Sequence, residues 1–276
     1  MIPKRYIKSM ILPVLFIIIW QMLSISIDNA IILPRVDSIT ELLIRPTQDL
    51  LSIGSLIDNT IISVIRVIIG YIIASIVAIT LGMIIGYSHK LDEFLLPFLS
   101  IFRPIAPLAW VPLVLAWFGV SSLATITGVE QGSLYIQLNN IKLSMLFIIF
   151  IGAFFPILTN TIYGVKSVKK TLIDSALTLG ANRKQIFTKV LLPASLPSIV
   201  TGLRIGLGVA WMCLVSAEML PGSLSGIGYL ITHAYTVART DVVIAGMISI
   251  SLVGGFLEFT FQKIENKFFK WQRMER

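Results

Sequence analysis

The sequence predicts an all-α integral membrane protein with six membrane-spanning helices, organised as a single domain over residues 1–276. Its 276 residues are 56% hydrophobic and 13% charged, whereas a soluble domain carries roughly 25% charged residues. The hydrophobic residues form runs of about 20, the length that crosses a hydrocarbon core of about 30 Å as a helix. A net charge of +8 is distributed unevenly between the connecting segments, and this unevenness indicates an orientation.

Six apolar runs are expected to cross the membrane. They cover residues 9–27, 61–88, 94–118, 143–165, 198–220 and 242–261. The first run follows a short basic segment, an arrangement that is also found in cleaved signal peptides. Its length of about 19 residues is sufficient to span the hydrocarbon core, and we therefore expect a retained first helix at 9–27.

The connector at 28–59 contains a proline-marked turn followed by a short surface helix. Pro34 lies within the turn, and Asp37 or Ser38 is expected to cap the helix, because their side chains accept hydrogen bonds from the first free N–H groups.

The second and third runs differ in their helix-disrupting residues. Gly82 and Gly86 lie four residues apart in the second run, a spacing that allows another helix to approach closely. The third run contains four prolines, which remove hydrogen-bond donors and kink or break helices. These are Pro97, Pro104, Pro107 and Pro112. Freed carbonyl groups cannot face lipid, and the third run is therefore expected to line an internal pathway.

The last two runs are rich in small residues. In the fifth run, Gly202, Gly206, Gly208 and Ala210 are placed for close helix packing. A Gly/Ser-rich turn and a short helix are expected between residues 221 and 241. The tail from 263 to 276 is basic and includes Phe268, Phe269 and Trp271, which suits a membrane interface.

Residues 167–193 form a polar island between two apolar runs and are predicted to be a helical hairpin. Gly180 can adopt a left-handed backbone and end the first helix. Asn182 and Gln185 have capping-box spacing at the start of the second helix, which Pro193 is expected to end. An inner stripe is predicted for the first helix. It comprises Val168, Leu172, Ile173, Ala176 and Leu177.

The positions of the basic residues determine the orientation. With six spans and a cytoplasmic N-terminus, 15 of the 22 lysines and arginines fall on the inside, within residues 4–8, 90, 166–189 and 263–276. Only four fall outside, and three lie within spans. The positive-inside rule therefore places both termini and the 167–193 hairpin in the cytoplasm. This topology accounts for the basic excess, so binding to nucleic acid is not expected.

The hairpin resembles the EAA signature of permease subunits of binding-protein-dependent ABC importers. The resemblance rests on Ala176, Gly180, Val190, Leu192 and Pro193. Asp174 and Ser175 stand where the family usually has Glu and Ala, and Asp174 keeps the charge. The resemblance extends over about 59–271, including the segment RPIAPLAWVPLVLAWFG, and points to the nitrate, sulfonate, taurine and bicarbonate branch.

The resemblance implies a type I importer permease whose cytoplasmic hairpin docks on an ATPase subunit. The implied coupling residues are Asp174, Ala176, Leu177, Gly180, Ala181, Phe187, Val190, Leu192 and Pro193. It further implies ABC ATPase subunits, an extracytoplasmic substrate-binding protein and a second permease copy, forming a homodimer, as partners in the plasma membrane. The chain itself would be a transport subunit rather than an enzyme, without a cofactor, and its cargo a small anionic solute. The segment 120–142 exceeds the family's connector by roughly twenty residues, and we leave open whether it contacts the binding protein or is locally disordered.

Four charged residues within spans are candidates for the pathway or its gate. They are Arg66, Arg103, Arg204 and Glu218. An arginine at mid-membrane costs roughly 2.5–3.5 kcal/mol on insertion scales, so such residues usually face the protein interior. Arginines would suit an oxyanion cargo. The alternative is that they pair with one another, for instance Arg204 or Arg66 with Glu218, or reach the interface with their charged ends.

Two other classes of protein fit the sequence less well. An ion-coupled secondary transporter or channel would more often show inverted repeats and midplane carboxylates for the coupling ion, and the sequence shows neither a repeat nor a carboxylate pair. An intramembrane enzyme would require a catalytic constellation. The sequence contains one cysteine, two distant histidines and no G-x-x-x-x-G-K-[ST] phosphate loop. An energy source on a separate subunit is therefore favoured.

Overall fold

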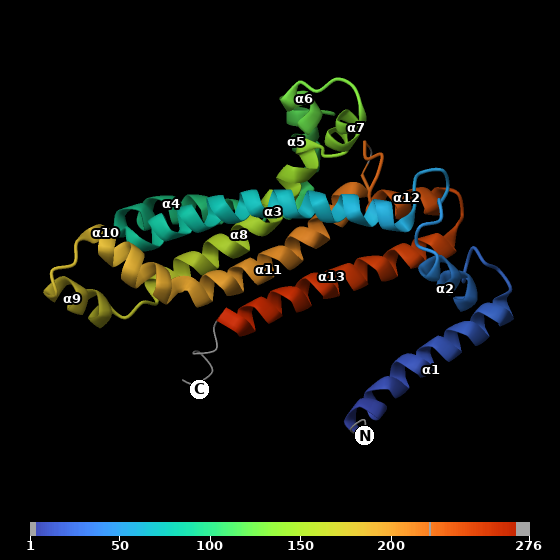
Figure 1. Ribbon diagram of the computed structural model, residues 1–276, viewed down its shortest axis with the longest axis horizontal. Helices are drawn as coiled ribbons and strands as arrows, with labels where there is room; N and C mark the ends of the chain where they lie inside the picture. The colour runs from blue at the N-terminus through green and yellow to red at the C-terminus, as the bar shows by residue number, and fades with distance from the viewer. Residues whose placement is uncertain (1–3, 221, 269–276) are drawn as a thin grey trace. The chain divides into compact units, whose positions relative to one another are not determined.

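The computed structural model describes residues 4–220 and 222–268, and the side chains of 11–220 and 222–267. Within these residues the fold is helical and contains no strand, only two isolated bridges, Asp49–Ser55 and Ser122–Lys142 (Figure 1). The interfacial tail predicted around Phe268, Phe269 and Trp271 and the basic side chains of Lys4, Arg5 and Lys8 lie outside what is described.

The long helices fit the predicted spans. Among the described residues, four segments are long and apolar enough to cross a membrane: Leu56–Tyr87, Leu143–Lys166, Arg183–Glu218 and Thr240–Lys267. A bent pair, His89–Phe102 with Pro107–Phe118, supplies a fifth, and α1 (Lys4–Ile27) contributes an apolar helix at the predicted first span. The fold is therefore an all-α membrane protein, and the arrangement is compatible with six spans.

The chain divides into two compact units. The first comprises residues 1–63 and 218–252, and the second comprises residues 64–217 and 253–276. The boundary falls inside α3 (Leu56–Tyr87), α11 (Leu192–Glu218) and α13 (Thr240–Phe268). The single domain expected over 1–276 stays a prediction.

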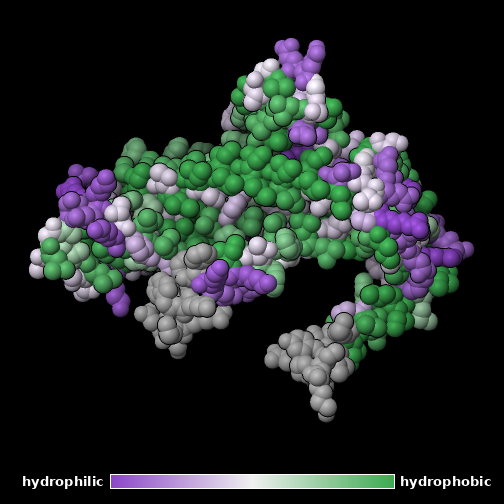
Figure 2. Space-filling view, viewed as in Figure 1, coloured by the Kyte–Doolittle hydropathy of each residue, from purple (hydrophilic) through white to green (hydrophobic). Residues whose placement is uncertain are grey.

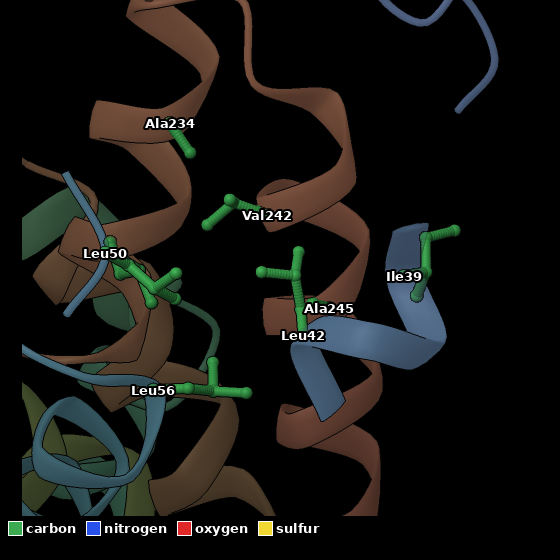
Figure 3. Packing of buried hydrophobic residues seen from close by; sticks show 8 residues of the cluster. Ile39, Leu42, Leu50, Leu56, Ala234, Val242 and Ala245 are labelled. Atoms are coloured by element: carbon green, nitrogen blue, oxygen red, sulfur yellow. The ribbon is translucent and has the colours of Figure 1, made fainter. Parts of the chain in front are cut away.

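In the first unit, α2 (Val36–Ile44) and α12 (Ile227–Thr236) pack with α13 around a small apolar core. Figure 3 shows the side chains of this core meeting between the helices. Its buried members are Ile39, Leu42, Leu50, Leu56, Leu230, Ala234, Val242 and Ala245.

The expected cap of α2 was wrong. The helix begins at Val36, so Asp37 and Ser38 lie inside it, and Arg35 at the N-cap position makes no side-chain capping bond. The N–H of Val36 instead donates to Oε1 of Gln21 at 2.9 Å, and Nε2 of Gln21 donates to the Asp37 carboxylate at 3.1 Å. A residue of α1 therefore caps α2, which local spacing does not reveal.

In the second unit, the third predicted span is broken into α4 (His89–Phe102), η1 (Pro107–Trp110) and α5 (Val111–Phe118), with a bend of 83°. Pro97 lies inside α4 and Pro112 in the first turn of α5, so neither ends its helix. The break falls at residues 103–106, beside Pro104 and Pro107. Two prolines three residues apart deny the backbone the donors that a continuous helix needs.

The segment between α5 and α8 (Leu143–Lys166) forms two short helices, α6 (Leu123–Thr127) and α7 (Ser133–Asn139). Its ends are tied together, because the N–H of Leu123 donates to the carbonyl of Ile141 and the N–H of Leu143 donates to that of Ser121. The alternative of local disorder for 120–142 therefore does not hold.

Glycines bring α8 close to its neighbours in the second unit. A Cβ on Gly82 of α3 would lie 2.7 Å from Cβ of Thr161, and one on Gly86 would lie 2.8 Å from Cβ of Val165. On α11, a Cβ on Gly202 would lie 2.7 Å from Cβ of Asn160. The close approach predicted at Gly82 and Gly86 is confirmed, as it is at Gly202 and Gly206. Gly208, however, has open space around it.

We predict that Gly202→Ala lowers the thermal stability of the purified protein, whereas Gly208→Ala does not. The new methyl group at position 202 would meet backbone atoms of Ile157 and Pro156 at 3.3 Å as well as Asn160, and overpacking of this kind typically costs about 1–3 kcal/mol. Unfolding temperatures in detergent measure the effect. Equal unfolding temperatures for the two variants would contradict the packing described for α8 and α11.

Candidate functional site

The hairpin predicted at 167–193 is present, with its turn fixed by local hydrogen bonds. It begins with α9 (Lys170–Thr178), followed by Gly180 at a φ of +80°. The N–H of Ala181 donates to the carbonyl of Ala176 at 3.0 Å, and that of Gly180 donates to Leu177 at 2.9 Å. These two bonds are the Schellman pattern that ends a helix at a left-handed glycine, as the sequence predicts.

The second arm begins with the predicted capping box. The N–H of Gln185 donates to Oδ1 of Asn182, and the N–H of Asn182 donates to Oε1 of Gln185, both at 2.8 Å. The box opens α10 (Arg183–Gln185), which passes into the π-helical turn η2 (Ile186–Leu191). The angle between the two arms is therefore set by residues 180–185.

The prediction that Pro193 ends the second helix was wrong. The helix continues from η2 into α11, so residues 183–218 form one uninterrupted rod. In η2 the N–H of Leu192 donates to the carbonyl of Phe187, five residues back. This wider turn gives the ring of Pro193 room that a regular α-helix would not provide.

The candidate coupling residues divide between the inside and the outside of the hairpin. Ala176, Ala181, Phe187 and Leu192 pack against a core that contains Met83 of α3, Val165 of α8 and Ile199 of α11. Val190 is half-buried, whereas Asp174, Gly180 and Pro193 are exposed. The inner set, which is partly buried, therefore anchors the hairpin to the long helices.

Three exposed leucines form what we call the hairpin tip: Leu172, Leu177 and Leu179. The exposed fraction is 52% for Leu177 and 88% for Leu179. The sequence prediction placed Leu172 and Leu177 on the inner stripe, but only Ile173, Ala176 and Val168 pack inward. Leu179 was not singled out, although its position directly before the turn glycine removes it from the stripe.

Charged side chains surround the hairpin tip. Lys169, Lys170, Arg183, Lys184 and Lys189 are all exposed. Figure 2 shows hydrophilic residues gathered at the end formed by α9 and α10, while hydrophobic residues cover the long helices of the same unit. An exposed apolar tip ringed by charge is typical of a docking surface rather than of a lipid-facing one.

The buried Glu218 caps a helix. In the first unit its side chain is fully buried, and its Oε2 accepts the N–H of Gly228 at 3.1 Å. Ser63 donates its hydroxyl to the same carboxylate at 2.8 Å and accepts the N–H of Ile227 at 2.9 Å, while Oδ1 of Asn59 accepts the N–H of Gly226. A carboxylate at a helix N-terminus is stabilised by the helix dipole, which gives Glu218 a structural role at α12.

The three arginines within the predicted spans have different surroundings. In the second unit, Arg204 pairs with Glu265 at 3.1 Å and with Glu258 at 3.7 Å, both on α13. The alternative of ion pairing therefore applies to Arg204, although with partners other than Glu218. Arg66 is 1% exposed, and its Nε donates to the carbonyl of Asn140 at 2.8 Å, which anchors the base of the 120–142 segment.

Arg103 differs from both. It lies at the C-cap of α4, at the start of the break, and is exposed. Throughout the described part of the chain, no residue is hydrogen-bonded or ion-paired to its guanidinium. Of the candidate pathway arginines, Arg103 is thus the one whose charge has no partner among the described residues.

Comparison with known proteins identifies the family. Residues 78–270 match the model of the binding-protein-dependent transport system inner membrane component. A chain from Methanocaldococcus jannaschii that is named as an ABC transporter permease protein is 51% identical over 98% of this chain and 94% of its own length. A Bacillus subtilis aliphatic sulfonates transport permease protein is 32% identical, covering 98% and 90% respectively.

Further relatives carry the names of taurine, bicarbonate and nitrate permease proteins, from Escherichia coli, Synechococcus elongatus and Leptolyngbya laminosa, at 30%, 34% and 39% identity. They confirm the predicted branch. The fold is similar to an inward-facing structure of the MetNI methionine ABC transporter, with a TM-score of 0.61, covering 77% of this chain and 95% of that one at 17% identity.

We predict that Ser63→Ala speeds hydrogen exchange at the amides of Ile227 and Gly228. The substitution removes the acceptor of one N–H and a donor to Glu218, and an unsatisfied buried polar group costs about 1–3 kcal/mol. Ser75→Ala is the control, because the Ser75 hydroxyl donates to the carbonyl of Tyr71 in its own helix, away from α12. Exchange measured by mass spectrometry should change at α12 in the first variant alone. Unchanged α12 exchange would contradict the capping role.

Proposed function

Because this chain belongs to the family of inner membrane components of binding-protein-dependent transport systems, we propose that it forms the membrane pathway of an ATP-driven importer for a small oxyanion. The hairpin tip carries the proposal. It consists of exposed apolar side chains on a charged hairpin, which four partly buried residues hold against the long helices.

We propose that the hairpin tip docks on an ABC ATPase subunit. Leu177 and Leu179 expose apolar surface to water on a segment whose charges keep it out of the bilayer. Covering an exposed leucine gains about 1.5–3 kcal/mol, and the surrounding lysines and arginines suit an acidic rim on the partner. Asp174 is exposed on the same helix and supplies one charge of opposite sign.

The rest of the machine follows from the family. Two copies of this chain would form the pathway, two ATPase subunits would bind the hairpin tips, and an extracytoplasmic binding protein would deliver the cargo. ATP binding would draw the hairpins together and open the pathway to the outside, and hydrolysis would reverse the movement. The chain carries no phosphate-loop motif of its own, which fits a transport subunit powered by a neighbour.

The proposed cargo class comes from the relatives and from one side chain. The names of the relatives refer to sulfonates, taurine, bicarbonate and nitrate, which share an oxygen-bearing anionic group. A guanidinium binds such groups through parallel N–H donors. Arg103, at the break of the third span and without an ion pair among the described residues, fits this task.

We predict that Leu179→Asp reduces the amount of ATPase that co-purifies with the permease by about tenfold or more, because it replaces a buried apolar contact with a charge. The side chain is 88% exposed in the isolated chain, so the unfolding temperature of the permease should not change. Leu134→Asp, at an exposed leucine of α7, is the matched control and should leave co-purification intact.

If the Leu179→Asp variant co-purifies with a normal amount of ATPase, docking at the hairpin tip is contradicted. Loss of capture by the control as well would indicate a general effect of the added charge rather than a specific surface.

We also predict the orientation of the chain. In a Cys213→Ser background, Lys184→Cys should react with a membrane-impermeant maleimide in inverted vesicles only, and Leu134→Cys in intact cells only. Both side chains are exposed, so accessibility depends on the side of the membrane. Reaction of the Lys184→Cys variant in intact cells would contradict a cytoplasmic hairpin and cytoplasmic termini.

A further inference from the structure

We propose that a cavity beside the break of the third span is a binding site for a small oxyanion in transit, with Arg103 as its cation. The cavity lies within the second unit and has a volume of about 370 Å³. Ligand sites typically measure roughly 300–1,000 Å³, so this space accommodates a small ion with part of its hydration shell. The inference rests on the proposed function, because it names a site on the pathway.

The polar groups of the cavity come from two elements. Arg103 stands at the end of α4, and Thr159 and Asn160 lie on α8, one turn after Pro156. The other lining residues are all apolar, and they include Pro107, Gly152 and Pro156. Of the described residues that line it, none is acidic. A cavity with one fixed positive charge and low-polarity walls attracts anions and excludes cations.

The hydrogen-bond donors are held in place. Nδ2 of Asn160 donates to the carbonyl of Pro156 at 2.8 Å, which leaves its second N–H for a ligand. The backbone of Gly202 allows α11 to press against Asn160, so this wall cannot shift easily. Thr159 donates its hydroxyl to the carbonyl of Phe155 at 2.9 Å, and its methyl group adds apolar wall. The site therefore offers one cation and one hydrogen-bond donor whose position is held by the protein.

The depth of Arg103 supports a site on a pathway. On the predicted third span, which begins at residue 94, Arg103 is placed about 14 Å from the start at 1.5 Å per residue, well inside a hydrocarbon core of about 30 Å. An arginine there is costly unless it faces a polar cavity or a partner. Arg66 and Arg204 bond to protein groups, whereas Arg103 faces the cavity.

The experiment measures charge selectivity in the cavity without requiring transport. Thr159→Cys in a Cys213→Ser background is assembled with its ATPase in phosphatidylcholine nanodiscs. The new thiol is treated with the anionic ethylsulfonate and the cationic trimethylammonium methanethiosulfonate reagents. We expect Arg103→Gln to lower the ratio of anionic to cationic reaction rates about tenfold, since a charge that lines the same cavity as the thiol acts strongly in a low dielectric. Arg103→Lys should keep most of the ratio.

Sodium nitrate and sodium methanesulfonate serve as ligand probes. Each should slow the anionic reagent at the Thr159→Cys thiol when Arg103 is present, and neither should do so in the Arg103→Gln variant. A rate ratio that is indifferent to Arg103→Gln would overturn the proposal. A ratio that disappears in phosphatidylglycerol nanodiscs, with no protection by either salt, would assign Arg103 to lipid headgroups and would also overturn it.

Uptake by the reconstituted importer separates this inference from the proposed function. Wild-type proteoliposomes with the ATPase and binding protein are given nitrate, bicarbonate, taurine and methanesulfonate. We expect Arg103→Gln to reduce uptake of the transported ion at least tenfold while leaving assembly unchanged. A wild-type importer that moves none of these solutes would contradict the proposed function. The proposed binding site would still be supported if the ratio of anionic to cationic reaction rates at the Thr159→Cys thiol depended on Arg103. If Arg103→Gln prevents assembly of the importer but leaves the ratio of reaction rates unchanged, Arg103 contacts the second permease copy instead, and the proposed site is wrong.

Discussion

A polypeptide inside a bilayer has to satisfy its own backbone hydrogen bonds, because lipid offers none. Each irregular point of this chain shows how that requirement is met. At the start of α12, three successive N–H groups find acceptors on Asn59, Ser63 and Glu218. At the break between α4 and η1, prolines reduce the number of donors that need partners. Around Pro193, a π-helical turn shifts the pairing by one residue. Asn59, Ser63, Arg66 and Glu218 therefore act as partners of backbone groups, and Arg204 pairs with carboxylates. Among the described residues, Arg103 has neither kind of partner.

Local patterns could be predicted well from the sequence. The stop at Gly180 and the capping box of Asn182 and Gln185 depend on residues a few positions apart. The spacing of Gly82 and Gly86 is also local, although the helix that packs against them is α8. Their geometry follows from backbone conformation and from the absence of a Cβ, and both can be read along a single helix. The candidate hairpin was therefore located correctly, down to its turn.

Long-range partnerships could not be predicted. Arg204 lies 61 residues from Glu265, and Ser63 lies 155 residues from Glu218, so nothing in spacing pairs them. The predicted cap of α2 was wrong for the same reason, because the acceptor, Gln21, is on another helix. The direction of Leu177 depends on how α9 packs on the core, and a stripe of five apolar residues does not decide it. Pro193 would end a regular α-helix, but the π-helical turn before it lets the helix continue.

The hairpin is joined to its two neighbouring long helices in unequal ways. On one side, residues 183–218 are helical throughout, about 54 Å of rod at 1.5 Å per residue. On the other side, α8 ends at Lys166 and α9 begins at Lys170, with a non-helical connection between them. A force applied to the hairpin would consequently reach α11 through continuous helical hydrogen bonds, but would reach the backbone of α8 only through a non-helical segment.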